Sequence, residues 1–167
     1  KIKEIKDILS DLELEIFTYR DFQSFPQIKE DGTTFIENAI HKAKTVAQWT
    51  GIISIADDSG LEVDALDGRP GVYSARFAGE GCSDYENNMK LLDLMKDIPL
   101  NSRGAVFRCV IAIATPEGDI KVTEGTWRGI IGFKPEGTNG FGYDSVFIVP
   151  EYNKTSAQLL PEEKNKI

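Results

Sequence analysis

Apolar residues recur with the period of an α-helix in two stretches of the first fifty residues. In residues 1–10 they are spaced for one helix face, so we predict that a helix opens the chain. Residues 34–49 predict a second helix. Thr34 and Glu37 have the spacing of a capping box at its start, and Gly51 follows its end. The predicted apolar face consists of Ile36, Ala39, Ile40, Ala43, Val46 and Ala47.

Two further helices are predicted later in the chain. Ser83 and Glu86 again have capping-box spacing, and a helix is expected to begin there. Its apolar residues include Tyr85, Met89, Leu92 and Met95. A last helix is predicted after Lys154.

Shorter apolar or alternating stretches between these helices predict the strands of a sheet. They are residues 12–17, 52–56, 61–66, 104–116, 120–133 and 146–150. The turn at 116–119 separates the two longest stretches and predicts an antiparallel hairpin. Loops are expected at 21–33, 67–71 and 136–145. The order of elements predicts an α/β chain whose mixed sheet contains long antiparallel strands.

The composition predicts one globular domain spanning residues 1–167. Hydrophobic residues make up 41% and charged residues 28%. The formal net charge of −8 argues against a nucleic-acid partner, which needs a basic surface. No apolar stretch approaches the ~20 residues of a membrane helix. Cys82 and Cys109 suggest neither a disulfide framework nor a metal site, and we expect both to be reduced in the cytoplasm.

The apolar stretch at 52–56 ends in two adjacent acids, Asp57 and Asp58, followed by Ser59 and Gly60. Two carboxylates at the end of a buried strand repel each other and resist desolvation. One interpretation is a turn at the strand end, where Asp and Ser are common. The other is a metal site, because carboxylate oxygens are the ligands that Mg²⁺ prefers and a cation would relieve the repulsion.

A phosphate ligand near these acids would need a positive charge. Lys42 lies four residues after Asn38, so the two share a helix face, although a helix lysine is also commonly a solvated charge. Glu30, in the preceding loop, is a candidate metal ligand and otherwise one of 27 acids. The single histidine, His41, stands near no G-x-S-x-G motif, and the sequence has no Walker A motif.

Residues 138–144, TNGFGYD, form a second unusual loop. Phe141 and Tyr143 flank Gly142, and Asp144 follows. Glycine permits close backbone approach, an aromatic ring can stack on a nucleobase, and a carboxylate can bind the polar edge of a base. A hairpin loop with its aromatic rings packed inward is the alternative interpretation.

Four segments together resemble one known family. They are TFIENAIHKA (34–43), ADDSGLEVDALDGRPGVYSARFAGE (56–80), GTNGFGYD (137–144) and EEKNKI (162–167). The chain is similar along essentially its whole length to the inosine/xanthosine triphosphate pyrophosphatases, house-cleaning enzymes for non-standard purine nucleotides. The resemblance implies an elongated mixed sheet flanked by helices, two lobes with a central active-site cleft, and a homodimer. It also implies Mg²⁺-dependent hydrolysis of ITP, dITP and XTP to the monophosphate plus pyrophosphate.

The resemblance assigns roles to single residues. Asp58 would be the general base and a Mg²⁺ ligand, with Asp57 beside it as a second catalytic acid. Glu30 would be another metal ligand, and Lys42 would face the phosphates. The residues expected to contact the substrate are Lys1, Ser59, Phe141, Gly142, Tyr143, Asp144 and Lys164.

The pattern of this family extends past both ends of the sequence. Lys1 matches the last residue of a Thr/Ser-x-Asn-x-x-Lys phosphate loop, and the family continues after KNKI into Ser-His-Arg. We therefore expect further residues at both ends of the domain. Two other hypotheses stay open: a Mg²⁺-dependent nucleotide pyrophosphatase of broader specificity, and a nucleotide-binding module without turnover.

Overall fold

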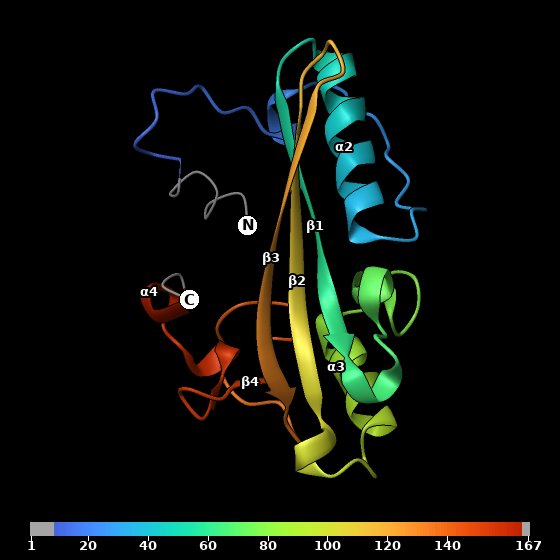
Figure 1. The fold of residues 1–167 in the computed structure, drawn as a ribbon, viewed down its shortest axis with the longest axis vertical. Helices are drawn as coiled ribbons and strands as arrows, with labels where there is room; N and C mark the ends of the chain where they lie inside the picture. Colours follow the sequence, from blue (N-terminus) through green and yellow to red (C-terminus); the bar gives the residue numbers. More distant parts are fainter. Residues whose placement is uncertain (1–8, 165–167) are drawn as a thin grey trace.

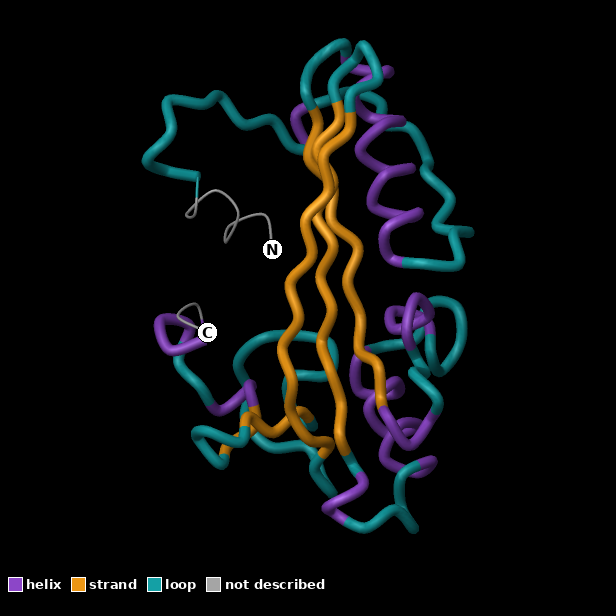
Figure 2. Tube along the Cα trace, viewed as in Figure 1, coloured by secondary structure: helices purple, strands orange, loops and turns teal. Residues whose placement is uncertain are grey.

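The computed structural model describes residues 9–164 of the chain. Three long strands run through the molecule, and the helices lie beside them (Figure 1). Figure 2 shows that the loops at one end of the sheet, 51–53 and 115–119, are short, whereas longer loops and short helices connect the elements at the other end. The predicted helix at 1–10 falls almost wholly outside the described residues, and Lys1 lies outside them too.

The sheet has five strands whose order in space is their order in the sequence. They are β1 (Ser54–Val63), β2 (Gly104–Ala114), β3 (Ile120–Ile131), β4 (Phe147–Val149) and β5 (Lys154–Thr155). Strands β2 and β3 form the predicted hairpin. Every pairing among the described strands is antiparallel. The α/β class and the long antiparallel strands are therefore confirmed. The sheet is not mixed within the described residues, because its five strands contain no parallel pair.

The two main helices begin where their capping boxes predict. For α2 (Phe35–Thr50), the Glu37 N–H donates to Thr34 Oγ1 at 3.1 Å, and the Thr34 N–H donates to Glu37 Oε2 at 3.2 Å. Gly51 ends α2 in the left-handed conformation, with φ of 71°. Helix α3 (Asp84–Leu94) begins with the equivalent box of Ser83 and Glu86.

Short helices connect the remaining segments. They are α4 (Pro161–Lys164) and the 3₁₀ helices η1 (Tyr19–Asp21), η2 (Asp64–Leu66), η3 (Gly71–Arg76), η4 (Leu100–Ser102) and η5 (Ser156–Gln158). The helix predicted after Lys154 is thus replaced by β5, η5 and the single turn of α4.

The two faces of the sheet are buried at opposite ends of the long strands. Because alternate residues of a strand point to opposite sides, we call face A the side of the Asp58–Val110 pair and face B the side of the Val63–Ala105 pair. On face A, α2 packs in a cluster formed by Phe35, Ala39, Ala43, Ala47, Val110, Ala112 and Ala114. On face B, α3 and β4 pack in a larger cluster that includes Leu61, Val63, Leu91, Leu92, Met95, Ala105, Ile131 and Phe147.

These two clusters are the cores of two lobes, as the resemblance implies. One segment joins them, because Val72 of η3 packs against the face A cluster and Phe77, just after η3, packs against the face B cluster. In Figure 1, η3 accordingly lies between α2 and α3.

Two predictions about strands are wrong. Residues 12–17 form no strand, and Leu12 and Leu14 are more than half exposed. Alternation alone does not make a strand without a neighbouring strand to bond. The strand predicted at 52–56 begins at Ser54 and does not stop at the acids, because β2 pairs with β1 along its whole length to Val63.

The predicted buried face of α3 is only partly right. Tyr85 and Met89 are exposed, whereas Leu91, Leu92 and Met95 are buried. Two amide side chains, Asn87 and Asn88, occupy the remaining buried positions. Asn87 can be buried because both polar atoms of its amide bond the backbone of Ala75 and Ala78, and the Asn88 amide nitrogen donates to the Gly142 carbonyl.

Candidate active site

A lysine and two acids from three segments meet where α2 crosses β1. Lys42 Nζ lies 2.7 Å from Asp58 Oδ1 and 2.9 Å from Glu30 Oε1. Asn38 Nδ2 donates to the other Asp58 oxygen at 3.2 Å. Asn38 and Asp58 are both buried, with 2% and 8% of their surface exposed. The structure thus brings together Lys42, Asp58 and Glu30, as the sequence predicts.

The local sequence explains this meeting. Asn38 and Lys42 are four residues apart, so both project from the same side of α2. The buried alanines of α2 let the helix approach β1 closely, and Asp58 projects from face A toward the helix. Asn38 Oδ1 also accepts the Gly32 N–H at 2.9 Å, which ties the loop that carries Glu30 to the helix.

Charge governs the behaviour of this cluster. Burial by itself lowers the pKa of Lys42, but hydrogen bonds and charge from Asp58 and Glu30 outweigh it and raise the pKa above its usual value. Lys42 is therefore a cation at neutral pH. The formal charges of Lys42, Asp58 and Glu30 sum to −1, so the cluster carries an excess of negative charge.

Asp57 and Ser59 lie on the other side of the sheet. Their side chains point to face B, where Ser59 Oγ donates to Asp57 Oδ2 at 3.0 Å. The expectation that Asp57 stands beside Asp58 at the end of a strand is wrong. Both acids are in the middle of β1, and the pleat of the strand separates their side chains.

The alternative interpretation of the loop at 138–144, in which its aromatic rings pack inward, holds for Tyr143 but not for Phe141. Tyr143 is 4% exposed, and its hydroxyl donates to the Ser74 carbonyl at 2.8 Å. Burial, together with the neighbouring Cys82 and Asp84, raises the pKa of Tyr143. Tyr143 thus has no ring face for a ligand, whereas Phe141 is about half exposed.

Asp144 anchors this loop from inside. It is 4% exposed and accepts hydrogen bonds from the Phe141 N–H at 3.0 Å and from Ser156 Oγ at 2.6 Å. Lys164 Nζ lies 2.6 Å from Asp144 Oδ2 and 5.5 Å from the centre of the Phe141 ring. Phe141, Asp144 and Lys164 therefore come together as the sequence predicts.

Segment 71–76 connects the loop with the Lys42–Asp58 cluster. Ser74 Oγ accepts the Leu61 N–H at 2.9 Å, and the Ser74 carbonyl accepts from Tyr143. Arg76 Nη2 donates to the Glu30 carbonyl at 3.1 Å. Neither Ser74 nor Arg76 was predicted from the sequence as a site residue. Both lie in segment 56–80, which carries the resemblance, and that position was the signal that could have identified them.

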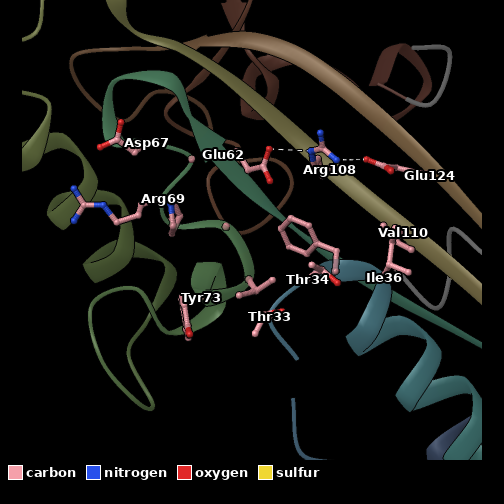
Figure 3. Close-up of a pocket in the computed structure, with 15 residues that line it drawn as sticks. Thr33, Thr34, Ile36, Glu62, Asp67, Arg69, Tyr73, Arg108, Val110 and Glu124 are labelled. Atoms are coloured by element: carbon pink, nitrogen blue, oxygen red, sulfur yellow. Dashed lines mark hydrogen bonds and ion pairs between the residues drawn. The ribbon is translucent and has the colours of Figure 1, made fainter. Parts of the chain in front are cut away.

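A hollow of about 420 Å³ lies farther along face A, between the first turn of α2 and residues 67–73 (Figure 3). On its sheet wall Arg108 pairs with Glu62 at 2.9 Å and with Glu124. This trio has the same charges as the Lys42 cluster, but each side chain is about one-third exposed. Water therefore screens it, whereas Lys42 and Asp58 are mostly enclosed.

The whole sequence, residues 1–167, matches the model of the Ham1 family. The chain belongs to the Ham1 family. It is 51% identical to a dITP/XTP pyrophosphatase of Desulforamulus reducens and 48% identical to one of Geobacter sulfurreducens. These matches span the whole chain and cover 83% and 84% of the two relatives.

A solved structure agrees with the fold of this Ham1 chain. It is a HAM1 protein from Coxiella burnetii, 42% identical, which superposes with a TM-score of 0.92. The match covers 99% of this chain and 85% of that protein. No helix of the Ham1 chain within residues 9–164 is long and apolar enough to span a membrane.

Proposed function

We propose that this Ham1 chain hydrolyses dITP, XTP and ITP to the nucleoside monophosphate plus pyrophosphate. The observation that carries the proposal is the enclosed cluster in which the Lys42 ammonium bridges Asp58 and Glu30. The names of the D. reducens and G. sulfurreducens relatives support the substrate class.

At the phosphate end, Asp58 acts as the general base. Lys42 and Asn38 hold one oxygen each of its carboxylate, so the group is fixed in orientation. A water molecule attacks the α-phosphorus, Asp58 takes its proton, and the bond from the α-phosphorus to the bridging oxygen breaks. Pyrophosphate leaves with that oxygen, and Lys42 stabilises the charge that develops on it.

Asp58 and Glu30 are suited to hold Mg²⁺. Their oxygens converge on one ammonium nitrogen, so a cation already lies between them. No group of three or more His, Cys, Asp or Glu converges anywhere in residues 9–164, which fits an ion held by one or two carboxylates and the substrate phosphates. Because the cluster is acidic overall and a triphosphate brings about four negative charges, a bound divalent cation would supply the attraction that Lys42 alone does not.

At the base end, the half-exposed Phe141 ring offers a stacking surface, and Lys164 is a donor beside it. Inosine and xanthosine carry an oxygen acceptor at the purine 6-position, whereas adenine carries an amino donor there. A site with donors rejects adenine because its buried donors would lose their partners. Tyr143 and Asp144, both buried, support this site from behind, and Gly142 belongs to its backbone.

A substrate panel tests the proposal. Release of pyrophosphate is measured from dITP, XTP and ITP against ATP, GTP and dUTP, with Mg²⁺ and with a chelator, and the nucleotide product is identified by chromatography. We expect monophosphate and pyrophosphate from the first three, no product from ATP, whose base lacks the acceptor at the 6-position, and no turnover with the chelator. Equal rates on dUTP or ATP would favour the broader pyrophosphatase. Calorimetric binding of ITP without turnover would favour the binding module.

Asp58→Asn tests the base directly. We expect kcat for dITP to fall at least about 100-fold, the loss typical of one electrostatic stabiliser. Glu62→Gln, on the same strand and face but in the Arg108 trio, is the matched control and should keep kcat within about twofold. Unchanged kcat in Asp58→Asn would refute the assignment.

We also propose a cytoplasmic homodimer, which the resemblance implies. The free Cys82 and Cys109 thiols are consistent with a reducing compartment. Light scattering of the purified protein should give twice the chain mass of 18.5 kDa.

A further inference from the structure

Two side chains of α3, Asp84 and Asn88, hydrogen-bond to the N–H and the carbonyl of Gly142, and we call this pair of contacts the grip. Asp84 Oδ2 accepts the Gly142 N–H at 2.6 Å, and Asn88 Nδ2 donates to the Gly142 carbonyl at 3.0 Å. Asp84 and Asn88 are four residues apart, so they project from the same side of the helix. Asn88 Nδ2 also donates to Ser145 Oγ at 3.1 Å, so the grip extends past Tyr143 and Asp144.

The helix behind this grip is firmly held. Ser83 and Glu86 cap its first turn, and its other end is fixed by the burial of Leu91, Leu92 and Met95 in the face B cluster. The loop bearing Phe141 is therefore attached to a packed element rather than to another loop. A hollow of about 210 Å³ opens beside the grip, and Asp84, Asn88 and Phe141 all line it.

Stability alone does not explain Asn88. The residue is 4% exposed, and its side-chain oxygen has no hydrogen-bond partner in the described part of the chain. A buried acceptor without a partner costs folding free energy, which an apolar side chain would avoid. The amide is useful at this position for its two donated bonds, both of which go to the 142–145 loop.

We propose that Asp84 and Asn88 are positioning residues for the purine base, acting through Gly142 on the stacking ring of Phe141. This inference rests on the proposed function. Because the grip acts at the base end, its loss weakens nucleotide binding and leaves attack at the α-phosphorus intact. KM for dITP therefore rises while kcat is kept.

Kinetics of three variants test the grip. Asn88→Asp keeps the shape of the side chain but removes both donors, and Asp84→Ala removes the acceptor. We expect KM for dITP to rise about tenfold in each, with kcat within about twofold. Asp84→Asn keeps an acceptor oxygen and should restore KM to within about threefold of the original. Asp84 is exposed at the first turn of α3, so Asp84→Ala folds even if Asn88→Asp does not.

Asn87→Asp is the matched control. Asn87 is also buried on α3, but its amide bonds the backbone of Ala75 and Ala78 instead of the 142–145 loop. It should lower the melting temperature and leave KM unchanged. The inference is overturned if Asn88→Asp and Asp84→Ala behave like this control.

Binding of dIMP, measured by calorimetry, separates this inference from the proposed function. A Kd weakened about tenfold in Asn88→Asp supports the grip even if the unmodified protein hydrolyses no dITP, an outcome that refutes the proposed function alone. An unchanged Kd for dIMP in both variants overturns the grip while leaving hydrolysis of dITP intact.

Discussion

Lys42 Nζ and Asp58 Oδ1 lie 2.7 Å apart, although sixteen residues separate them in the chain. Their contact fastens α2 to the middle of β1, with Asn38 as a second link. Because both side chains are mostly enclosed, we expect the contact to affect the stability of the fold as well as the proposed catalysis.

Replacing Lys42 by methionine should destabilise the fold. The substitution leaves the Asp58 and Glu30 carboxylates close together without their shared cation, at an expected cost of about 2–3 kcal/mol in unfolding free energy. Urea denaturation measures it. Lys44→Met, at an exposed position on the same helix, should change the unfolding free energy by less than about 0.5 kcal/mol. Equal stability of the two variants would contradict the role given to the pair.

The contribution of Lys42 should depend on pH in the alkaline range. Burial lowers the pKa of Lys42, but Asp58 and Glu30 outweigh burial and raise it above the unfolded value. The stabilisation is then fully present below the ordinary lysine pKa of about 10.4 and is lost as pH rises through the higher folded value. The difference in unfolding free energy between the unmodified protein and Lys42→Met should stay level from about pH 7 to 9.5 and shrink above that range. A difference that grows with pH would contradict this sign.

Gly60→Ala should destabilise the packing of η3, the segment that connects the two lobes, against β1. A methyl group at Gly60 would lie 2.5 Å from Ser74 Oγ and 2.6 Å from the Gly71 carbonyl oxygen. Relieving these contacts moves η3, and we expect a loss of about 1–3 kcal/mol in thermal or chemical unfolding. Gly125→Ala is the control, since a methyl group there meets nothing within 4 Å. Similar melting temperatures for both variants would argue against tight packing at Gly60.

Arg103 should be indispensable to the lobe on face B. The residue is 1% exposed, and its guanidinium donates to the carbonyls of Met95, Ile98, Ile131 and Gly132. Burial lowers the pKa of Arg103. Arg103→Met removes the guanidinium donors from these four carbonyls, so we expect a loss of at least about 3 kcal/mol in unfolding free energy.

Two comparisons complete the test of Arg103. Arg103→Lys should lie between Arg103→Met and the unmodified protein, because an ammonium cannot reproduce the planar fork of donors. Arg128→Lys changes an exposed pair with Asp64 and should matter by less than about 0.5 kcal/mol. Arg103→Met with full stability would show that water can replace the guanidinium.

Local signals in the sequence predicted the helix starts and the hairpin. The capping boxes at Thr34 and Ser83 and the turn at 116–119 involve residues only a few positions apart, so their physics is visible in the sequence. The extent of β1 was not predictable in this way. Its polar middle, Asp57 to Gly60, is a strand because β2 supplies hydrogen-bond partners more than forty residues away.

The same distinction holds for the site. Lys42, Asp58 and Glu30 were predicted from residue type and resemblance, and the structure brings them together. The separation of Asp57 from Asp58 required knowing that the acids lie within a strand, where neighbours point apart. Burial of Tyr143 and the grip of Asp84 and Asn88 on Gly142 depend on contacts between distant segments, which no local pattern records.

Strand β1 contributes side chains to both lobes. The number of residues along it therefore fixes which face of the sheet each side chain occupies. Asp58 and Gly60 share face A only because two positions separate them. Deleting or inserting one residue there would turn every later side chain of β1 over and would send Leu61 and Val63 out of their core. Variation in length is consequently expected in the loops at either end of β1, and evolution can change the strand itself only by substitution.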